Sequence, residues 1–173
     1  LRSLRRFMMS LLLLGGLVWA APLLIAKTDL RQKLPGLLVP DFQGQISIGG
    51  ANLNWTSPIE LHNLTATDTS GAELFEVSTV RSEKTLLDLV KDRSQLGTFT
   101  IQKPHLHLVF DNQSSNLERA LAATLTSEEE SSPPQLTLEI KEAAISIEDA
   151  ITSRKWEATS SSTVLVMGEQ ASL

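Results

Sequence analysis

The sequence predicts a mainly β fold with one N-terminal transmembrane helix, and three observations indicate this class. Residues 7–26 contain no charged side chain, and arginines precede them. From Gly44 onward, apolar and polar residues alternate in short runs, which is the period of half-buried strands. Turn residues such as those at 68–71 separate these runs. We therefore expect a twisted antiparallel sheet with two short helices, built on one side of a membrane.

Residues 7–26 have the length and composition of a membrane anchor. About 20 residues rising 1.5 Å each cross the hydrocarbon core of a bilayer, and Ser10 is the one hydroxylated residue in the segment. A cleaved signal peptide is the alternative, because residues 18–20 resemble a cleavage site. The apolar run continues beyond that point, and Trp19 is bulky for a residue beside a cut. These features favour a retained anchor that follows a short cytoplasmic tail.

The composition argues against several functional classes. The net charge is −5 at pH 7, whereas a nucleic-acid partner requires a basic face. The chain has no cysteine, which excludes disulfides, thiolate metal sites and cysteine nucleophiles. No serine lies in a nucleophile elbow, and no glycine pair is followed by the Lys-Ser/Thr of a phosphate loop. We therefore predict a protein that is not an enzyme and needs neither a cofactor nor a metal.

His105 and His107 are the strongest candidates for a metal site. Two residues apart on a strand, they point to the same face. Zinc needs at least a third ligand, and none stands nearby at a matching spacing. We interpret both histidines as polar residues on the solvent face of a sheet.

The remaining elements follow from alternation, helical leucine spacing and turn residues. Residues 28–38 are expected to continue helically until Pro35 and Gly36 end the segment. Residues 127–134, SEEESSPP, form a polar linker. Short helices are expected at residues 85–91 and 116–122, and strands at residues 45–48, 58–68, 72–80, 98–102, 105–110, 135–140, 144–148 and 157–167.

One internal similarity stands out among the predicted strands. Residues 98–108 align without a gap with residues 137–147. The apolar positions that match are Ile101 with Ile140, Leu106 with Ile145, and Leu108 with Ile147. A period of about 40 residues lies in the range of stacked repeats, but two unrelated hairpins also share such a pattern by chance. Both explanations are open from the sequence.

Each predicted strand has one apolar and one polar face, and a sheet of this kind must cover its apolar face. One hypothesis is an ordinary core, closed by a second sheet or by helices. The other is a groove that holds acyl chains, since the helices are short and aromatic residues make up only 5% of the chain. The apolar strand positions that would contact lipid are Ile46, Ile48, Ile59, Leu61, Leu74, Val77, Ile101, Leu106, Leu108, Leu138, Ile140, Ile145 and Ile147.

The order of these features carries a family resemblance. After the anchor come NWTSPIEL at 54–61, the turn at 68–71, TLLDL at 85–89 and NLE at 116–118. This order resembles the N-terminal part of bacterial AsmA-like proteins, the group that includes TamB and YhdP relatives. The resemblance implies a single-pass inner-membrane protein with the bulk of its chain in the periplasm. It also implies a gutter-like sheet with an apolar concave face and no catalytic residues.

The resemblance further implies a domain organisation and partners. Residues 1–27 would be the cytoplasmic tail and anchor, 28–126 an AsmA- or chorein-like β-meander, 127–134 a polar linker, and 135–173 strands of a longer repeat region. The implied function is phospholipid transport between membranes or outer-membrane maintenance, with phospholipid acyl chains, the inner-membrane bilayer and envelope proteins as partners. The alternatives are an assembly factor that pairs strands with a partner protein, and a secreted β-domain with a closed core.

Overall fold

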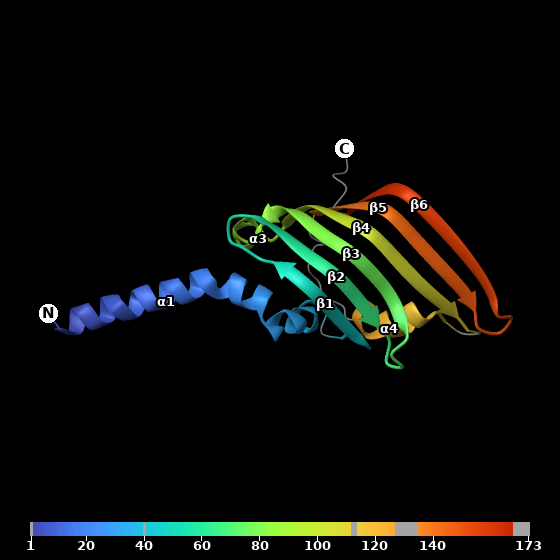
Figure 1. The fold of residues 1–173 in the computed structure, drawn as a ribbon, viewed down its shortest axis with the longest axis horizontal. Coiled ribbons are helices and arrows are strands. Elements are labelled where there is room, and N and C mark those ends of the chain that lie inside the picture. The colour runs from blue at the N-terminus through green and yellow to red at the C-terminus, as the bar shows by residue number, and fades with distance from the viewer. Residues whose placement is uncertain (1, 40, 112–113, 127–134, 168–173) are drawn as a thin grey trace.

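A long helix leads into an open, arched sheet (Figure 1) in the computed structural model, which describes residues 2–39, 41–111, 114–126 and 135–167. The six strands lie in chain order across the sheet. The helices are α1 (Arg2–Lys27), α2 (Leu34–Leu38), α3 (Leu86–Lys91) and α4 (Asn116–Thr126), with a 3-10 turn η1 (Asp29–Lys33). The strands are β1 (Gln45–Asn52), β2 (Pro58–Thr67), β3 (Glu73–Thr85), β4 (Gln95–Phe110), β5 (Gln135–Asp149) and β6 (Arg154–Met167). A mainly β fold with short helices is confirmed.

The prediction of a wholly antiparallel sheet is wrong, because β4 and β5 run parallel. Strands β1 to β4 form an antiparallel meander, and β6 pairs antiparallel with β5. Parallel neighbours cannot be joined by a hairpin and need a crossover, which here includes α4. The rest of the connection is the expected linker at 127–134, which lies outside the described residues. The sheet is therefore mixed.

The parallel pair places the two similar segments of the sequence side by side. Each segment belongs to one continuous strand, β4 or β5, and neither forms the hairpin that its sequence pattern suggested. The register pairs Thr98 with Thr137, Ile101 with Ile140, Leu106 with Ile145, and Leu108 with Ile147. This register coincides with the gapless alignment. The similarity therefore links two laterally stacked strands, which is the arrangement expected of a repeat.

A line of irregular residues, here called the crease, crosses the sheet. Asn63 in β2, Lys103 in β4 and Glu142 in β5 have φ values of 50°, 51° and 55°, in the left-handed region that L-residues rarely adopt. The registers on both sides place these residues at the same level, with Ser78 of β3 between the first two. Gly49 of β1 continues the line, and a Cβ there would lie 2.9 Å from the Cβ of Asn63.

The crease explains why β4 and β5 each resemble two short strands in the sequence. Across it, successive apolar positions are three residues apart instead of two, as with Leu61 and Leu64 in β2 or Ile101 and Pro104 in β4. An extra residue in a strand reverses the alternation of faces, so this spacing keeps one face apolar on both sides. Because neighbouring strands carry the extra residue at the same level, their pairing stays in register.

Glycine at the crease is expected to stabilise the sheet. An L-residue in the left-handed conformation costs about 1 kcal/mol, and Lys103→Gly removes this cost because glycine adopts the conformation freely. It also loses an ion pair with Glu142, but at 3.7 Å between side chains that are 64% and 68% exposed this pair contributes little. After the entropy of glycine in the unfolded chain, we expect a net gain of about 0.5 kcal/mol, or about 2 °C in Tm by thermal unfolding in detergent. Lys141→Gly, outside the left-handed region, should instead destabilise by about 1 kcal/mol, and equal losses in both variants would contradict the argument.

Helix α1 is continuous over its 26 residues and contains Pro22. Within the described part of the chain, no helix has both the length and the apolar character of a membrane span. The side chains of residues 2–14, which include the first part of the predicted anchor, lie outside the described residues. The expected helical continuation consists of η1, capped by Thr28, and α2. Pro35 lies in the first turn of α2 and does not end a helix, because its missing N–H has no helical partner there.

Candidate functional site

The apolar side chains of the strands lie in rows across the sheet, and we call the surface that they form the apolar face. Paired residues of neighbouring strands share a face, so the register defines each row. One row consists of Leu61, Val80, Ile101 and Ile140. A second row, on the other side of the crease, consists of Ile46, Ala66, Phe75, Leu106 and Ile145. The apolar face thus extends over β1 to β5.

The register brings nearly all of the residues predicted to contact lipid onto this face. Those placed by their cross-strand partners are Ile46, Ile48, Leu61, Val77, Ile101, Leu106, Leu108, Leu138, Ile140, Ile145 and Ile147. Ile59 lies two residues before Leu61 in β2, beside a register irregularity between Pro58 and Glu60. Phe75, Val80 and Phe99 were not among the residues predicted to contact lipid, although their partners Leu106, Ile101 and Leu138 place them on the same face.

Leu74 is the most completely buried of the predicted residues. It is 0% exposed and packs with Ala66 and with Ala120 of α4. The β2–β3 register shifts beside it, between Ala66 and Thr67. Such an irregularity directs two successive side chains to the same side, and Phe75 also packs against this cluster. Leu74 is therefore a core residue beneath α4 and does not line an accessible surface.

Helix α4 covers one end of the apolar face and is held there by buried polar contacts. Ser115 and Glu118 form a reciprocal cap, in which each backbone N–H donates to the side chain of the other residue, at 2.7 and 3.1 Å. Asn116, 3% exposed, donates to the carbonyl of His107 at 3.0 Å and accepts from the N–H of Val109 at 2.9 Å. The Asn116 amide thus binds β4 as a neighbouring strand would.

Exposure of the apolar face increases toward β6. Ile48 and Val77, in β1 and β3, are 3% and 6% exposed, whereas Ile145 in β5 is 37% exposed. In β6, Trp156 pairs with Ile147 and Leu165 with Leu138, and these two β6 side chains are 50% and 47% exposed. A closed hydrophobic core would bury such positions. The β5–β6 side of the apolar face is therefore accessible in the described structure.

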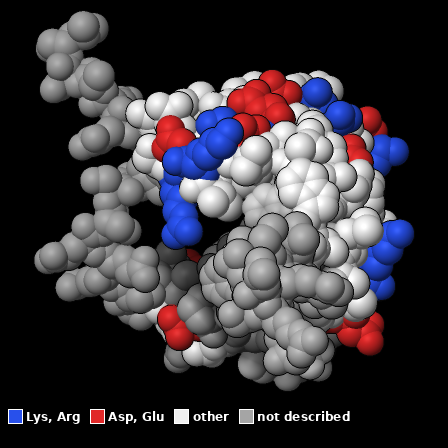
Figure 2. Space-filling view, turned by 90° about the vertical axis from the view of Figure 1, so that its left-hand side faces the viewer, with Lys and Arg blue, Asp and Glu red and all other residues white. Residues whose placement is uncertain are grey.

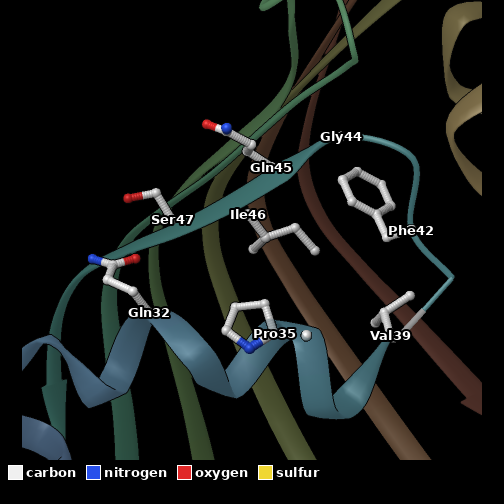
Figure 3. Close-up of a pocket in the computed structure, with 9 residues that line it drawn as sticks. Gln32, Pro35, Val39, Phe42, Gly44, Gln45, Ile46 and Ser47 are labelled. Carbon is white, nitrogen blue, oxygen red and sulfur yellow. The ribbon is translucent and has the colours of Figure 1, made fainter.

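A pocket of about 530 Å³ adjoins the apolar face at the β1 edge. Figure 3 shows Val39, Phe42 and Ile46 gathered around the space between α2 and β1, while Gln45 and Ser47 point away from it. Phe42 and Ile46 also pack against the buried cluster beneath α4. The volume is in the range of pockets that hold small apolar ligands, so the pocket extends the candidate site.

The two histidines considered as metal ligands lie on the polar face, opposite Leu106. His105 Nε2 lies 2.8 Å from Ser146 Oγ, and His107 Nε2 lies 3.2 Å from Glu73 Oε1. Their ring centroids are 3.9 Å apart. Among the described residues, no group of three His, Asp or Glu side chains is arranged to hold a metal ion. The arrangement matches two polar residues on one strand face.

The carboxyl groups with shifted pKa values lie in turns and helix caps. The Ser70 hydroxyl holds the pKa of Asp68 below its usual value, and the Thr152 hydroxyl does the same for Asp149. Because the folded-state pKa is lowered, these contacts stabilise the turns above the unfolded pKa, and the stabilisation is lost as pH falls through the folded pKa. Neither carboxyl group belongs to the rows of apolar side chains described above.

No protein-family model, curated protein or solved structure matches this chain.

Proposed function

We propose that the chain is an AsmA-like protein whose apolar face forms a gutter-like groove for phospholipid acyl chains. In this role it takes part in phospholipid transport between membranes or in outer-membrane maintenance. The observation that carries the proposal is the continuity of the apolar face over five strands together with its exposure toward β6. Large contiguous apolar surfaces of this kind occur where a protein binds apolar partners or ligands. The opposite face carries charged and hydroxylated side chains, which suit water.

The proposal includes anchoring of α1 in the inner membrane, with the sheet in the periplasm. A helix of 26 residues is about 39 Å long, enough for the hydrocarbon core of about 30 Å. Leu17 and Leu23 of α1 are 62% and 50% exposed. Exposed leucines along a long helix favour a lipid environment over water.

Lipid capture from the apolar face tests the proposal. Photo-crosslinking residues at Leu106 and Ile140 are expected to form adducts with phospholipid in cells, because both positions lie in rows of the apolar face. The matched controls are His107 and Lys141, the next residue in each strand, which lie on the polar face. Mass spectrometry of the adducts distinguishes the outcomes. Equal lipid capture at the control positions would contradict the groove.

A second candidate function is envelope assembly by strand pairing, and the open edge of the sheet at β6 favours it. At the β1 edge, the Gln32 side chain donates to the Ile48 carbonyl at 2.8 Å and accepts from the Ile48 N–H at 3.1 Å, so it occupies the pairing groups. The outer edge of β6 has no neighbouring strand among the described residues. Val164 and Val166 of β6 are 58% and 77% exposed. Open edges of this kind accept partner strands. Capture of protein alone, at Leu106 and at Val166, would support this second function.

A further inference from the structure

Trp55, between β1 and β2, ties the sheet to α1. Its indole Nε1 donates to the carbonyls of Trp19 at 3.0 Å and Val18 at 3.3 Å. Pro22 explains why the Val18 carbonyl is free to accept. A proline has no N–H, so it cannot bind the carbonyl four residues earlier, which is that of Val18, and its ring disturbs the neighbouring turn. The indole satisfies a carbonyl that α1 itself leaves without a helical donor.

This contact determines the level of the sheet along an anchored α1. At 1.5 Å per residue, residues 7–18 cover about 18 Å, which is well short of a hydrocarbon core of about 30 Å. Trp19 lies about 12 Å along the helix from Lys27. Pro22 and Ala26, beyond the contact, are buried within the protein. If residues 7–26 span the membrane, the segment around Trp55 therefore lies at the level of the leaflet nearer the sheet. We call this leaflet the proximal leaflet.

Helix α3 lies at the same end of the sheet as this contact. The Leu87 N–H donates to the Trp55 carbonyl at 3.3 Å, and Figure 1 shows α3 at the end of the sheet from which α1 projects. Leu87 is 38% exposed and Val90 is 56% exposed. Two apolar side chains on a helix of six residues thus project from the end of the molecule that faces the bilayer.

Basic side chains flank these two residues at Lys84, Lys91 and Arg93. Glu83, Asp88 and Asp92 lie among them, and hydrogen bonds from the Thr85 and Ser94 hydroxyls lower the pKa values of Asp88 and Asp92, so this segment carries charges of both signs. Figure 2, which faces this end, shows Lys and Arg side chains beside both Asp or Glu side chains and uncharged surface. Two exposed apolar side chains beside lysine and arginine side chains match a surface that inserts at the headgroup level of a bilayer.

We propose that α3 is a membrane-contact element that inserts Leu87 and Val90 among the acyl chains of the proximal leaflet. The flanking basic side chains then lie at the level of the lipid phosphates. This inference rests on the proposed anchoring of α1. It also deepens the proposed function. Phe99 and Leu138 of the apolar face lie at the same end of the sheet as α3, because Phe99 pairs with Ser82, which shortly precedes α3 in the chain. An acyl chain then passes from the leaflet to the apolar face without crossing water.

The absence of cysteine allows single labels to test the contact in the full chain. Val90→Cys, Trp19→Cys and Ile151→Cys are each labelled with the fluorophore NBD and reconstituted in vesicles of phosphatidylethanolamine and phosphatidylglycerol, in a ratio of about 7:3 to supply anionic headgroups. Ile151 is the matched control, 60% exposed in the turn between β5 and β6. Spin-labelled lipids should quench the labels at positions 19 and 90 several-fold more strongly than the label at position 151.

The three labels separate the possible failures. Quenching at position 19 without quenching at position 90 would overturn the role of α3 and leave the anchor standing. Lack of quenching at position 19 would overturn the anchor and the inference with it. A blue-shifted but unquenched label at position 90 would indicate protein contact, which also overturns the inference. Trp55→Phe removes the indole donor, and we expect it to lower quenching at position 90 by up to about fivefold while position 19 is unchanged.

Discussion

Leu74→Ala is expected to destabilise the sheet by about 3 kcal/mol, the largest stability effect among the substitutions considered. Leu74 is 0% exposed, and its side chain fills the space between Ala66 and Ala120 of α4. Alanine would remove its apolar contacts and leave a cavity, and such changes cost about 2–5 kcal/mol in protein cores. Its buried neighbours Ala66 and Ala120 have no side chain long enough to fill the space. Urea unfolding of the full chain in detergent, followed by circular dichroism, measures the loss.

A matched control separates core packing from general sensitivity of the sheet. Val90→Ala also truncates an aliphatic side chain, but Val90 is 56% exposed and should cost about 0.5 kcal/mol or less. The two variants should therefore differ by about 2 kcal/mol or more. Similar losses in both variants would show that Leu74 is not the centre of the packing beneath α4.

Alternation of apolar and polar residues was sufficient to predict the apolar face. Ile101, Leu106 and Ile140 were selected from the sequence alone, and the register places all three on that face. Alternation is a local property, because side chains along a strand point to opposite faces in turn. The gapless alignment coincides with the β4–β5 register, although the sequence analysis did not predict that these two segments pair.

Three features depend on information that local patterns do not carry. Strands β4 and β5 continue through Lys103 and Glu142 in left-handed conformations, where the shift of apolar spacing looked like a strand end. The parallel direction of β5 depends on the path of the crossover. The contact of Trp55 with α1 joins residues 36 and 37 positions apart in the sequence. The missing N–H of Pro22 was the one available signal, since it implied an unsatisfied carbonyl in α1.

Ile101→Asp is expected to reduce phospholipid capture at Ile140 by about tenfold or more, because a carboxylate among acyl chains costs several kcal/mol unless it is paired. Ile101 and Ile140 are partners across the parallel β4–β5 ladder, so the new charge would lie beside the crosslinking position. Capture is measured as the fraction of crosslinked protein that carries lipid. Unfolding in urea is followed in parallel, so that lost capture is compared only among variants that remain folded.

Gln102→Asp provides the control one residue further along β4, where the side chain lies on the polar face opposite Lys141. The same charge is introduced at nearly the same place in the sheet, but it faces water and a lysine. If the apolar face holds lipid, Gln102→Asp retains capture at Ile140 and Ile101→Asp does not. Equal loss in both variants would show that net charge or stability governs capture, and the lipid groove would then have no support from this pair. Retained capture in both variants would place the lipid elsewhere, for example in the pocket between α2 and β1 (Figure 3). That pocket adjoins β1, which lies at the opposite edge of the sheet from β5 and β6.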